Sequence, residues 1–341
     1  MSEKSGFEKF SELARPALRQ ELEGAIAASA EHGTPGLHEM ITYQLGWTGE
    51  NAGPKAEGKQ IRPLLVLLAC QAGGGDWRKA LPAAAAVELI HNFSLVHDDI
   101  EDNGEVRRGR PTVWKIWGEA QAINTGDAIF ALAFASLVNL IKTTSPEIVL
   151  GAGTIFHQTC LRLTQGQHLD IAFEDQENVE LESYWKMVGG KTAALLAFSL
   201  EVGALCAGVS PEIQSQYRDF GHYLGMSFQV QDDILGIWGA EEQLGKSTTG
   251  DIITRKKSLP ILYGLAQEKE FYEGWNEGEI TPEKALVLSQ ILEAEGGRAY
   301  AQSTADRLID LALTALENAN PEAESGLILE ELAKKLLKRQ E

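Results

Sequence analysis

The sequence predicts an all-α protein, a single large bundle of long helices, and three observations support this. Apolar residues recur at helical spacing along nearly all of the 341 residues, no segment alternates apolar and polar residues as half-buried strands do, and several helical segments open at a proline. Hydrophobic residues make up 44% and charged residues 23% of the chain, which is a globular composition. Because no low-complexity linker divides the sequence, we expect one domain over residues 1–341.

The expected helices follow one another along the chain. A stretch rich in Gly, Pro and Asn, 46–58, separates the first helices from the rest. A helix over 61–70 stops at the glycines 73–75, and the next runs over 81–102 with Pro82 in its first turn, where proline is tolerated. Further helices are expected over 120–141, 146–167, 181–206, 211–238, 259–269, 282–294, 298–319 and 321–339. Four of these open near a proline preceded by Ser, Thr or Asn, residues that can cap a first turn.

Charge and cysteine content limit the possible partners. The chain has 30 Lys and Arg against 49 Asp and Glu, a net charge of −19, which argues against nucleic acid and anionic membranes as general partners. Cys70, Cys160 and Cys206 lie far apart among apolar residues, so buried thiols in a reducing compartment are expected. The N-terminus has no basic-then-apolar signal, and polar residues interrupt the apolar stretches. We therefore expect a soluble, cytoplasmic protein with no membrane span.

The first acidic motif lies at 95–103 and contains four acidic residues within five positions. Asp98 and Asp102 are four residues apart, so a helix places both carboxylates on one face, where they repel each other. Mg²⁺ would relieve this repulsion, because it prefers oxygen ligands and completes its shell with water and substrate phosphates. Arg107 and Arg108 follow closely and could hold a diphosphate. The alternative is an acidic surface helix whose charge these arginines neutralise.

The second acidic motif is Asp232-Asp233, which interrupts an otherwise apolar helix. Ionised aspartates are seldom buried without a partner, so this pair must reach solvent, a base or a metal. Lys246 and the basic run 255–257 follow, as the arginines follow the first motif. Two such units in one helical chain predict a shared cleft in which metal ions bridge carboxylates and a diphosphate.

Two further basic sites are candidates for anion binding. Lys59 and Arg62 are three residues apart at the start of an expected helix, whose N-terminus also favours anions. Lys191-Thr192 follows Gly189-Gly190, a pair expected to interrupt a long helix flexibly. Taken alone, each site is also compatible with an ordinary surface base.

These motifs together resemble the trans-isoprenyl diphosphate synthases, the polyprenyl synthase family. The resemblance covers roughly 58–262 and rests on five motifs in the family's order, which are Gly58-Lys59-Gln60-Ile61-Arg62-Pro63, Asp98-Asp99-x-x-Asp102, Arg107-Arg108-Gly109, Lys191-Thr192 and Phe228-Gln229-x-Gln231-Asp232-Asp233. It implies an all-α bundle around a central cleft, the isoprenoid synthase type, and a homodimer.

The resemblance also implies a role for each matching residue. Three Mg²⁺ ions would be bound at Asp98, Asp99, Asp102, Asp232 and Asp233, with Asp99 and Asp233 in support. The allylic diphosphate would contact Arg107, Lys191 and Lys246, with Thr192 and Gln229 nearby. Isopentenyl diphosphate would contact Lys59, Arg62, His91 and Arg108. Lys256 matches a further lysine near the second metal site, and Gln167 and Asp170 fit a pair facing the diphosphate. Without the family, His91 would be interpreted as a core histidine.

One residue departs from the family pattern. The second motif usually carries a third carboxylate four residues after its first aspartate, and this chain has Gly236 there. The favoured interpretation is that this third carboxylate acts through water and is dispensable. The alternative is weakened metal affinity, or a subunit with reduced activity.

The implied reaction joins isopentenyl diphosphate to dimethylallyl, geranyl or farnesyl diphosphate. Loss of diphosphate from the allylic substrate leaves a carbocation, which the double bond of isopentenyl diphosphate attacks. Proton loss, to the released diphosphate, then gives the product extended by five carbons. Phe93 and Ser94 lie about one helical turn (~6 Å) before Asp98, where the family sets product length. A single aromatic residue beside a small one resembles short-chain geranylgeranyl diphosphate synthases. Three alternatives remain, which are a farnesyl diphosphate synthase, a non-catalytic partner subunit and, less favoured, a class I terpene cyclase. Phe93 as ordinary core packing is equally compatible with its position.

Overall fold

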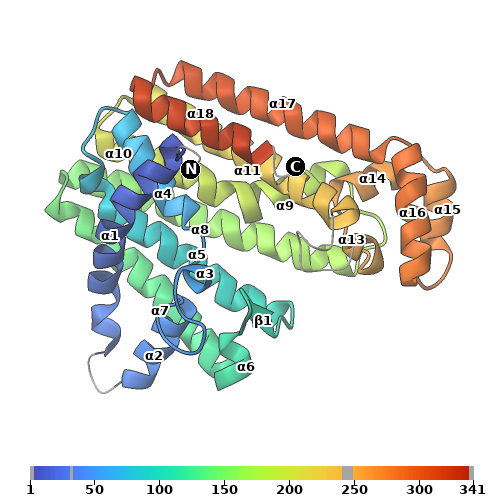
Figure 1. Ribbon diagram of the computed structural model, residues 1–341, viewed down its shortest axis with the longest axis horizontal. Helices are drawn as coiled ribbons and strands as arrows, with labels where there is room; N and C mark the ends of the chain where they lie inside the picture. Colours follow the sequence, from blue (N-terminus) through green and yellow to red (C-terminus); the bar gives the residue numbers. More distant parts are fainter. Residues whose placement is uncertain (1–3, 31–33, 240–248, 338–341) are drawn as a thin grey trace. The chain divides into compact units, whose positions relative to one another are not determined.

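The computed structural model describes residues 4–30, 34–239 and 249–337, and these are almost entirely helical (Figure 1). The prediction of an all-α fold is therefore confirmed. Among the described residues the one sheet is a hairpin in which β1 (Val106–Arg107) pairs antiparallel with β2 (Arg110–Pro111). Arg108 and Gly109 form its turn with φ values of 53° and 75°, the left-handed conformation that tight hairpin turns require.

The chain packs into two compact units, and each is described separately. Unit 1 comprises Met1–Phe156, Ser199–Ser215 and Pro321–Leu329, and unit 2 comprises His157–Phe198, Gln216–Asn320 and Glu330–Glu341. The single domain expected from the sequence stays a prediction.

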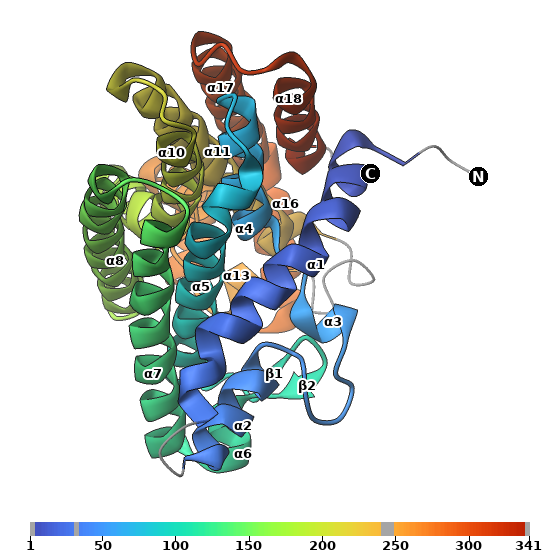
Figure 2. The ribbon, with the colours of Figure 1, turned by 90° about the vertical axis from the view of Figure 1, so that its left-hand side faces the viewer.

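Unit 1 is built around two adjacent long helices, α5 (Leu81–Glu101) and α7 (Glu119–Val138), which run side by side (Figure 2). Beside α5 lies α4 (Ile61–Ala72), whose side chains from Leu64 to Cys70 are all fully buried, as expected of a helix that is apolar on every face. The remaining α-helices wholly within this unit are α1 (Gly6–Ile26), α2 (Pro35–Gln44), α3 (Pro54–Glu57) and α6 (Val113–Trp117). The 3₁₀ turns η1 (Ala27–Ala30), η2 (Trp77–Ala80) and η3 (Asn139–Lys142) complete it.

Four further helices contribute residues to both units. They are α8 (Pro146–Glu174), α10 (Ala194–Ala207), α11 (Pro211–Trp238) and α18 (Ala323–Leu337). Unit 2 also contains α9 (Leu181–Val188), the π-helical turn η4 (Gly189–Ala193), α13 (Gly250–Ile253), α14 (Leu259–Ala266), α15 (Glu270–Asn276), α16 (Pro282–Ala294) and α17 (Gly297–Asn318). One core cluster of this unit gathers Tyr184, Val230 and Leu259, and a second gathers Ile237, Ile252 and Phe271. These clusters hold the segments that carry the second acidic motif.

The observed helices differ from the expected ones at several places. Helix α8 continues past 167 to Glu174, and α14 ends at Ala266, short of the expected 269. Gly189 and Gly190 do not interrupt the helix, which continues through them as a π turn. Helix α4 begins at Ile61, so Lys59 lies ahead of the helix and not on its face. Helix α18 begins at Ala323, two residues after Pro321. The cap expected at Thr281 is present, because its side chain accepts a hydrogen bond from the backbone N–H of Lys284 at 3.3 Å.

Two helical stretches satisfy the length and hydropathy of a membrane span. They are Glu119–Lys142 and Leu181–Ala207, whose apolar windows are 39% and 72% buried within the protein. Such stretches are also found in the cores of proteins that cross no membrane, so the expected absence of a membrane span stays a prediction. Cys70, Cys160 and Cys206 are free thiols, and burial raises the pKa of Cys70 and of Cys160 to about 12.

Candidate active site

The first acidic motif closes the C-terminal end of α5. The backbone N–H of Asp102 donates to the carbonyl of Asp98 at 2.9 Å, so the helical spacing that brings these two residues onto one face is present. Asp102 is exposed and Asp98 is partly exposed. Both therefore offer carboxylate oxygens at the surface of unit 1.

Asp99, unlike Asp98 and Asp102, is buried. The residue is 4% exposed, and its Oδ1 accepts a hydrogen bond from Nε of Arg107 at 2.7 Å. Burial raises the pKa of Asp99, and the charge of Arg107 opposes that rise. Asp99 thus orients Arg107, which lies on β1.

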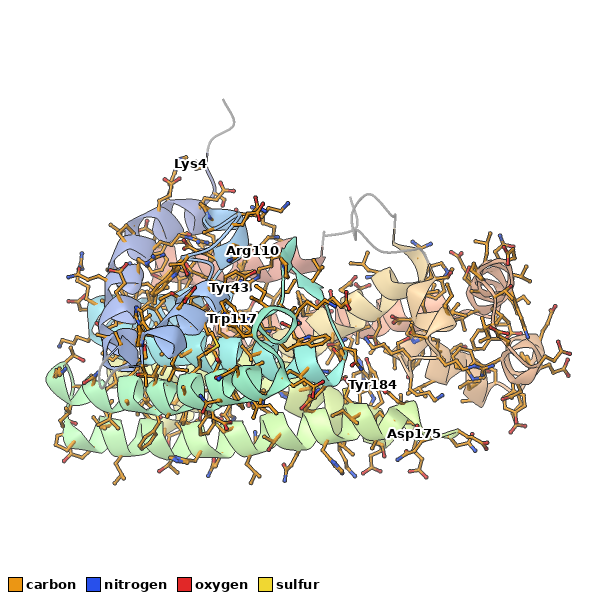
Figure 3. All side chains as sticks on the ribbon, turned by 90° about the horizontal axis from the view of Figure 1, so that it is seen from below. Lys4, Tyr43, Arg110, Trp117, Asp175 and Tyr184 are labelled. Atoms are coloured by element: carbon orange, nitrogen blue, oxygen red, sulfur yellow. The ribbon has the colours of Figure 1, made fainter. Side chains whose placement is uncertain are left out.

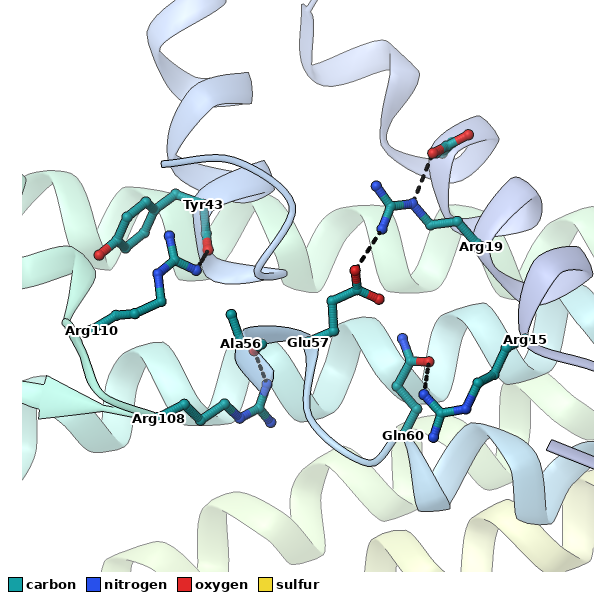
Figure 4. A network of polar contacts seen from close by, with 9 residues as sticks. Arg15, Arg19, Tyr43, Ala56, Glu57, Gln60, Arg108 and Arg110 are labelled. Carbon is teal, nitrogen blue, oxygen red and sulfur yellow. Dashed lines mark hydrogen bonds and ion pairs between the residues drawn. The ribbon is translucent and has the colours of Figure 1, made fainter. Parts of the chain in front are cut away.

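Arg108 reaches back to the segment that precedes α4. Its Nη1 donates to the carbonyl of Ala56 at 2.8 Å (Figure 4). Its guanidinium also lies against Gly58, because a Cβ on that glycine would come within 2.7 Å of the guanidinium carbon. Gly58 has φ = 77°, so both its backbone and its close contact favour glycine.

The predicted isopentenyl diphosphate residues gather in unit 1. Nη1 of Arg62 lies 3.5 Å from Nε2 of His91. Burial, together with the charges of Arg62, Arg108 and Arg107, lowers the pKa of His91 well below its usual value and keeps the imidazole neutral. We call Arg62, Arg107 and Arg108 the arginine cluster, and an anion is its natural counter-charge.

Arg15 of α1 holds the segment that carries Lys59, and no sequence motif pointed to it. Its Nη2 donates to the carbonyl of Lys59 at 2.5 Å and its Nη1 donates to Oε1 of Gln60 at 3.3 Å. Gln60 has φ = 49°, a left-handed conformation that needs such support. Arg19, one turn further along α1, pairs with Glu57 at 3.2 Å (Figure 4). Helix α1 therefore fixes the chain on both sides of Gly58.

Glu88 is a second residue that sequence reasoning missed. It is 3% exposed on α5, and its Oε1 accepts a hydrogen bond from Nδ2 of Asn92 at 2.9 Å. Burial raises its pKa to about 7, although the charges of Arg108 and Arg62 favour the ionised form. An acidic residue inside the apolar run at 81–90 was the available signal.

Arg110 is buried and bonded to the backbone of a distant segment. It is 5% exposed, and its Nη2 donates to the carbonyl of Thr48 at 2.6 Å. Its guanidinium carbon lies 3.9 Å from the centre of the Tyr43 ring, which packs edge-on against Trp117 (Figure 3). Tyr43, Arg110 and Asp99 line a cavity of about 20 Å³, room for about one water molecule.

In unit 2, Lys191 and Thr192 lie on the π turn, a feature that often marks functional sites. The turn packs closely on α8, since a Cβ on Gly166 would come within 2.1 Å of the backbone nitrogen of Lys191. The ammonium of Lys191 donates to Asp170 of α8, the helix that also carries Gln167.

A chain of hydrogen bonds joins this turn to Asp233. Thr192 Oγ1 donates to Oε1 of Gln229 at 2.7 Å, and Nε2 of Gln229 donates to Oδ1 of Asp233 at 3.0 Å. The other oxygen, Oδ2, accepts from the hydroxyl of Tyr184 at 2.7 Å and from the backbone N–H of Leu259 at 2.9 Å. Asp233 is 1% exposed. Its carboxylate is therefore committed to donors of the protein, whereas Asp232 is partly exposed.

Lys256 lies among the carboxylates of this unit. Desolvation alone would lower its pKa, but the charges of Asp251, Asp233, Asp170 and Asp232 together raise it. Lys246, the remaining predicted diphosphate ligand, lies outside the described residues.

The residues present fit Mg²⁺ bound mainly by substrate. Within 4–30, 34–239 and 249–337, no three His, Cys, Asp or Glu side chains come together closely enough to hold a metal ion by themselves. The carboxylates of Asp98 and Asp102 in unit 1 and of Asp232 in unit 2 are each at least partly exposed, and they are hard oxygen donors of the kind that Mg²⁺ takes in ones and twos, with water and phosphate oxygens completing its shell.

Phe93 borders a row of aromatic rings in unit 1. Its ring packs edge-on against Phe130 of α7 at 5.1 Å between ring centres, and Phe130 lies 6.4 Å from Phe156. Ser94 turns toward its own helix, where its hydroxyl donates to the carbonyl of His91 at 2.8 Å.

Comparisons with known proteins identify the family. Residues 51–286 match the family model described as polyprenyl synthetase. A (2E,6E)-farnesyl diphosphate synthase of Mycobacterium bovis is 37% identical over 339 residues, covering 96% of this chain and 91% of that protein. A geranylgeranyl diphosphate synthase of Mycobacterium tuberculosis is 37% identical over 292 residues, covering 83% and 82%. The crystal structure of a geranylgeranyl pyrophosphate synthetase from Pyrococcus horikoshii matches with a TM-score of 0.87 and 31% identity, covering 98% of each chain. As the order of its motifs predicted, the chain belongs to the polyprenyl synthetase family.

Proposed function

We propose that the protein is a short-chain trans-prenyltransferase that joins isopentenyl diphosphate to an allylic diphosphate. Membership of the family supports the reaction class, and its relatives are named for farnesyl and geranylgeranyl diphosphate. The observation that carries the proposal is the arginine cluster beside a neutral His91 and the first acidic motif. A group of three partly exposed cations is suited to a diphosphate.

In this proposal isopentenyl diphosphate binds to Lys59, Arg62, His91 and Arg108. Arg15 and Gly58 fix the backbone of this pocket, so the charges are in place before the substrate arrives. His91, kept neutral, can donate one hydrogen bond without adding a further charge to be compensated.

In this proposal the allylic diphosphate binds to Arg107 of unit 1 and to Lys191 of unit 2, where Thr192 and Gln229 are further candidate contacts, and Lys246 is the remaining predicted contact. Mg²⁺ bound at Asp98, Asp102 and Asp232 would neutralise the charge that builds on the departing diphosphate. Asp99 holds Arg107, and Asp233 holds Gln229, so we assign these two carboxylates a positioning role and not direct metal binding. The aspartates and basic groups thereby stabilise a charge that develops in the transition state, the most effective place for electrostatic catalysis.

Geranylgeranyl diphosphate is the proposed product. Phe93 and the small Ser94 would line the path of the growing chain, with Phe130 next along it. Farnesyl diphosphate is the second candidate, because a relative covering 96% of this chain carries that name.

One assay tests these assignments. The purified protein is incubated with Mg²⁺, labelled isopentenyl diphosphate and dimethylallyl, geranyl or farnesyl diphosphate in turn, and products are identified by mass spectrometry. Prenyl diphosphates are expected, and Asp98→Asn should abolish them while Asp310→Asn, an exposed change on α17, should not. Hydrocarbons formed without isopentenyl diphosphate would indicate a terpene cyclase instead. No product with any primer would favour a non-catalytic subunit.

We further propose that the protein is a homodimer in the cytoplasm. Helix α7 leaves an apolar stripe exposed, with Ile123, Phe134 and Val138 each more than 40% accessible, which is unusual for a helix that faces only water. The free thiols and the net charge of −19 suit a soluble protein in a reducing compartment. Light scattering coupled to size-exclusion chromatography should give twice the chain mass, and Phe134→Glu should shift it toward the monomer.

A further inference from the structure

The departure at Gly236 has a structural counterpart elsewhere in unit 2. A Cβ built on Gly236 would lie 2.5 Å from Oδ2 of Asp251 and 2.6 Å from its Cγ. Real Cβ atoms essentially never come this close to another heavy atom. The carboxylate of Asp251 therefore occupies the space that a side chain at position 236 would fill.

The position of Gly236 on α11 relates this contact to the second acidic motif. Gly236 follows Asp232 by four residues in one continuous helix, so it lies one turn further along the same face. A carboxylate packed against Gly236 thus stands where the side chain of an acidic residue at this position would begin.

The segment that carries Asp251 is firmly anchored. Ile252, the next residue, is fully buried in the cluster with Ile237 and Phe271. Arg255 donates two hydrogen bonds to backbone carbonyls, at 3.0 Å to Trp275 and 2.6 Å to Gly278. The contact between Asp251 and Gly236 is therefore held by the core of unit 2.

Asp251 shares the electrostatic surroundings of the second acidic motif. Among the carboxylates that raise the pKa of Lys256, Asp251 contributes most, and Asp232 belongs to the same group. The backbone N–H of Lys256 also donates to the carbonyl of Asp251 at 2.9 Å. Asp251, Asp232 and Lys256 are thus close enough to affect one another's charge.

We propose that Asp251 supplies the third carboxylate that this chain lacks at Gly236 and supports the Mg²⁺ bound by Asp232. This inference rests on the proposed function. Mg²⁺ retains several water molecules when it binds to proteins, and a carboxylate one helical turn away can orient them. Asp251 is in this sense a positioning residue, acting on the metal through its water.

The test measures metal binding directly. Free Mn²⁺, as a probe for Mg²⁺, is titrated by electron paramagnetic resonance into the full chain with inorganic pyrophosphate present. Asp251→Asn should weaken Mn²⁺ binding by roughly 10–100-fold, the usual cost of losing a partner behind a metal ligand. Asp219→Asn is the matched control and should bind as the wild type does, because Asp219 lies on α11, the helix of Asp232, but is paired with Arg218.

The double variant Gly236→Asp/Asp251→Ala distinguishes the loss of a carboxylate that supports the metal from general disruption of the protein. It returns a carboxylate to α11 and removes the one from α13, so it should recover most of the lost Mn²⁺ affinity. Thermal unfolding of each variant checks that the fold is intact. Wild-type affinity in Asp251→Asn would overturn the proposal, and so would a weakened Asp251→Asn that the double variant fails to rescue. A wild-type protein that binds Mn²⁺ with pyrophosphate but forms no prenyl product would refute the proposed function alone.

Discussion

Replacing Glu88 by Gln should make the protein more stable, by an amount that grows with pH. The pKa of Glu88 is raised by burial from 4.5 to about 7. Between pH 4.5 and about 7, the Glu88 carboxyl ionises in the unfolded chain but stays protonated in the folded one. The free energy of unfolding therefore falls as the pH rises, and above about pH 7 it falls no further from this cause. At 1.36 kcal/mol for each pH unit, the loss is about 3 kcal/mol. Gln does not titrate and can still accept the hydrogen bond from Asn92.

Urea unfolding of wild type and Glu88→Gln, followed by tryptophan fluorescence, measures this difference. The sequence pI is about 4.8, so a series from about pH 5.5 to 8.5 avoids precipitation and should still show about 2 kcal/mol of the increase. Glu39→Gln, an exposed change on α2, should show no such trend. A difference that stays flat with pH would refute the reasoning, and it would mean that Arg62 and Arg108 keep Glu88 ionised in the folded protein.

Three further substitutions test contacts described above, which are made by Arg15, Phe93 and Tyr184. Arg15→Met should raise the KM for isopentenyl diphosphate by about tenfold with a smaller change in kcat, because it removes the donors that hold the Lys59 segment; steady-state kinetics with an unchanged KM would count against this. Phe93→Ala should lengthen the product by at least one isoprene unit, and chromatography showing the wild-type distribution would contradict it. Tyr184→Phe should cost about 1.5–3 kcal/mol of unfolding free energy, since it removes a hydrogen bond to the buried carboxylate of Asp233. Equal stability by urea unfolding would show that this bond contributes nothing.

The parts of the site that sequence reasoning anticipated are local. Asp98 and Asp102 meet on one face because a helix brings together residues four apart, whatever the rest of the chain does. Helix bounds agreed closely with prediction where proline and apolar spacing coincide, as over Pro211–Trp238 and Pro282–Ala294.

The parts that sequence reasoning missed depend on packing between distant segments. Arg15 reaches Lys59 across 44 residues, and Tyr184 reaches Asp233 across 49. No spacing rule connects such pairs, because their meeting depends on how the helices pack. The interpretation of Gly189-Gly190 as a flexible interruption was wrong for a related reason. A glycine pair in a sequence is compatible with a flexible break and also with a close contact between helices. In the structure Gly190 packs against Gly166 of α8, so the pair serves a close contact, and the sequence alone does not show this.

The π turn at Gly189–Ala193 has a consequence for how this helix tolerates insertion and deletion. A π turn contains one residue more than the regular α-helical path, and each residue of an α-helix turns the next by about 100°. Because the wide turn absorbs that extra residue, Tyr184 before the turn and Phe198 after it keep the phase of one continuous helix. Deleting one residue within 189–193 would restore a regular helix without rotating these two lengths relative to each other. The turn should therefore tolerate a one-residue deletion better than the regular helix on either side, where the same deletion would rotate everything that follows by about 100°.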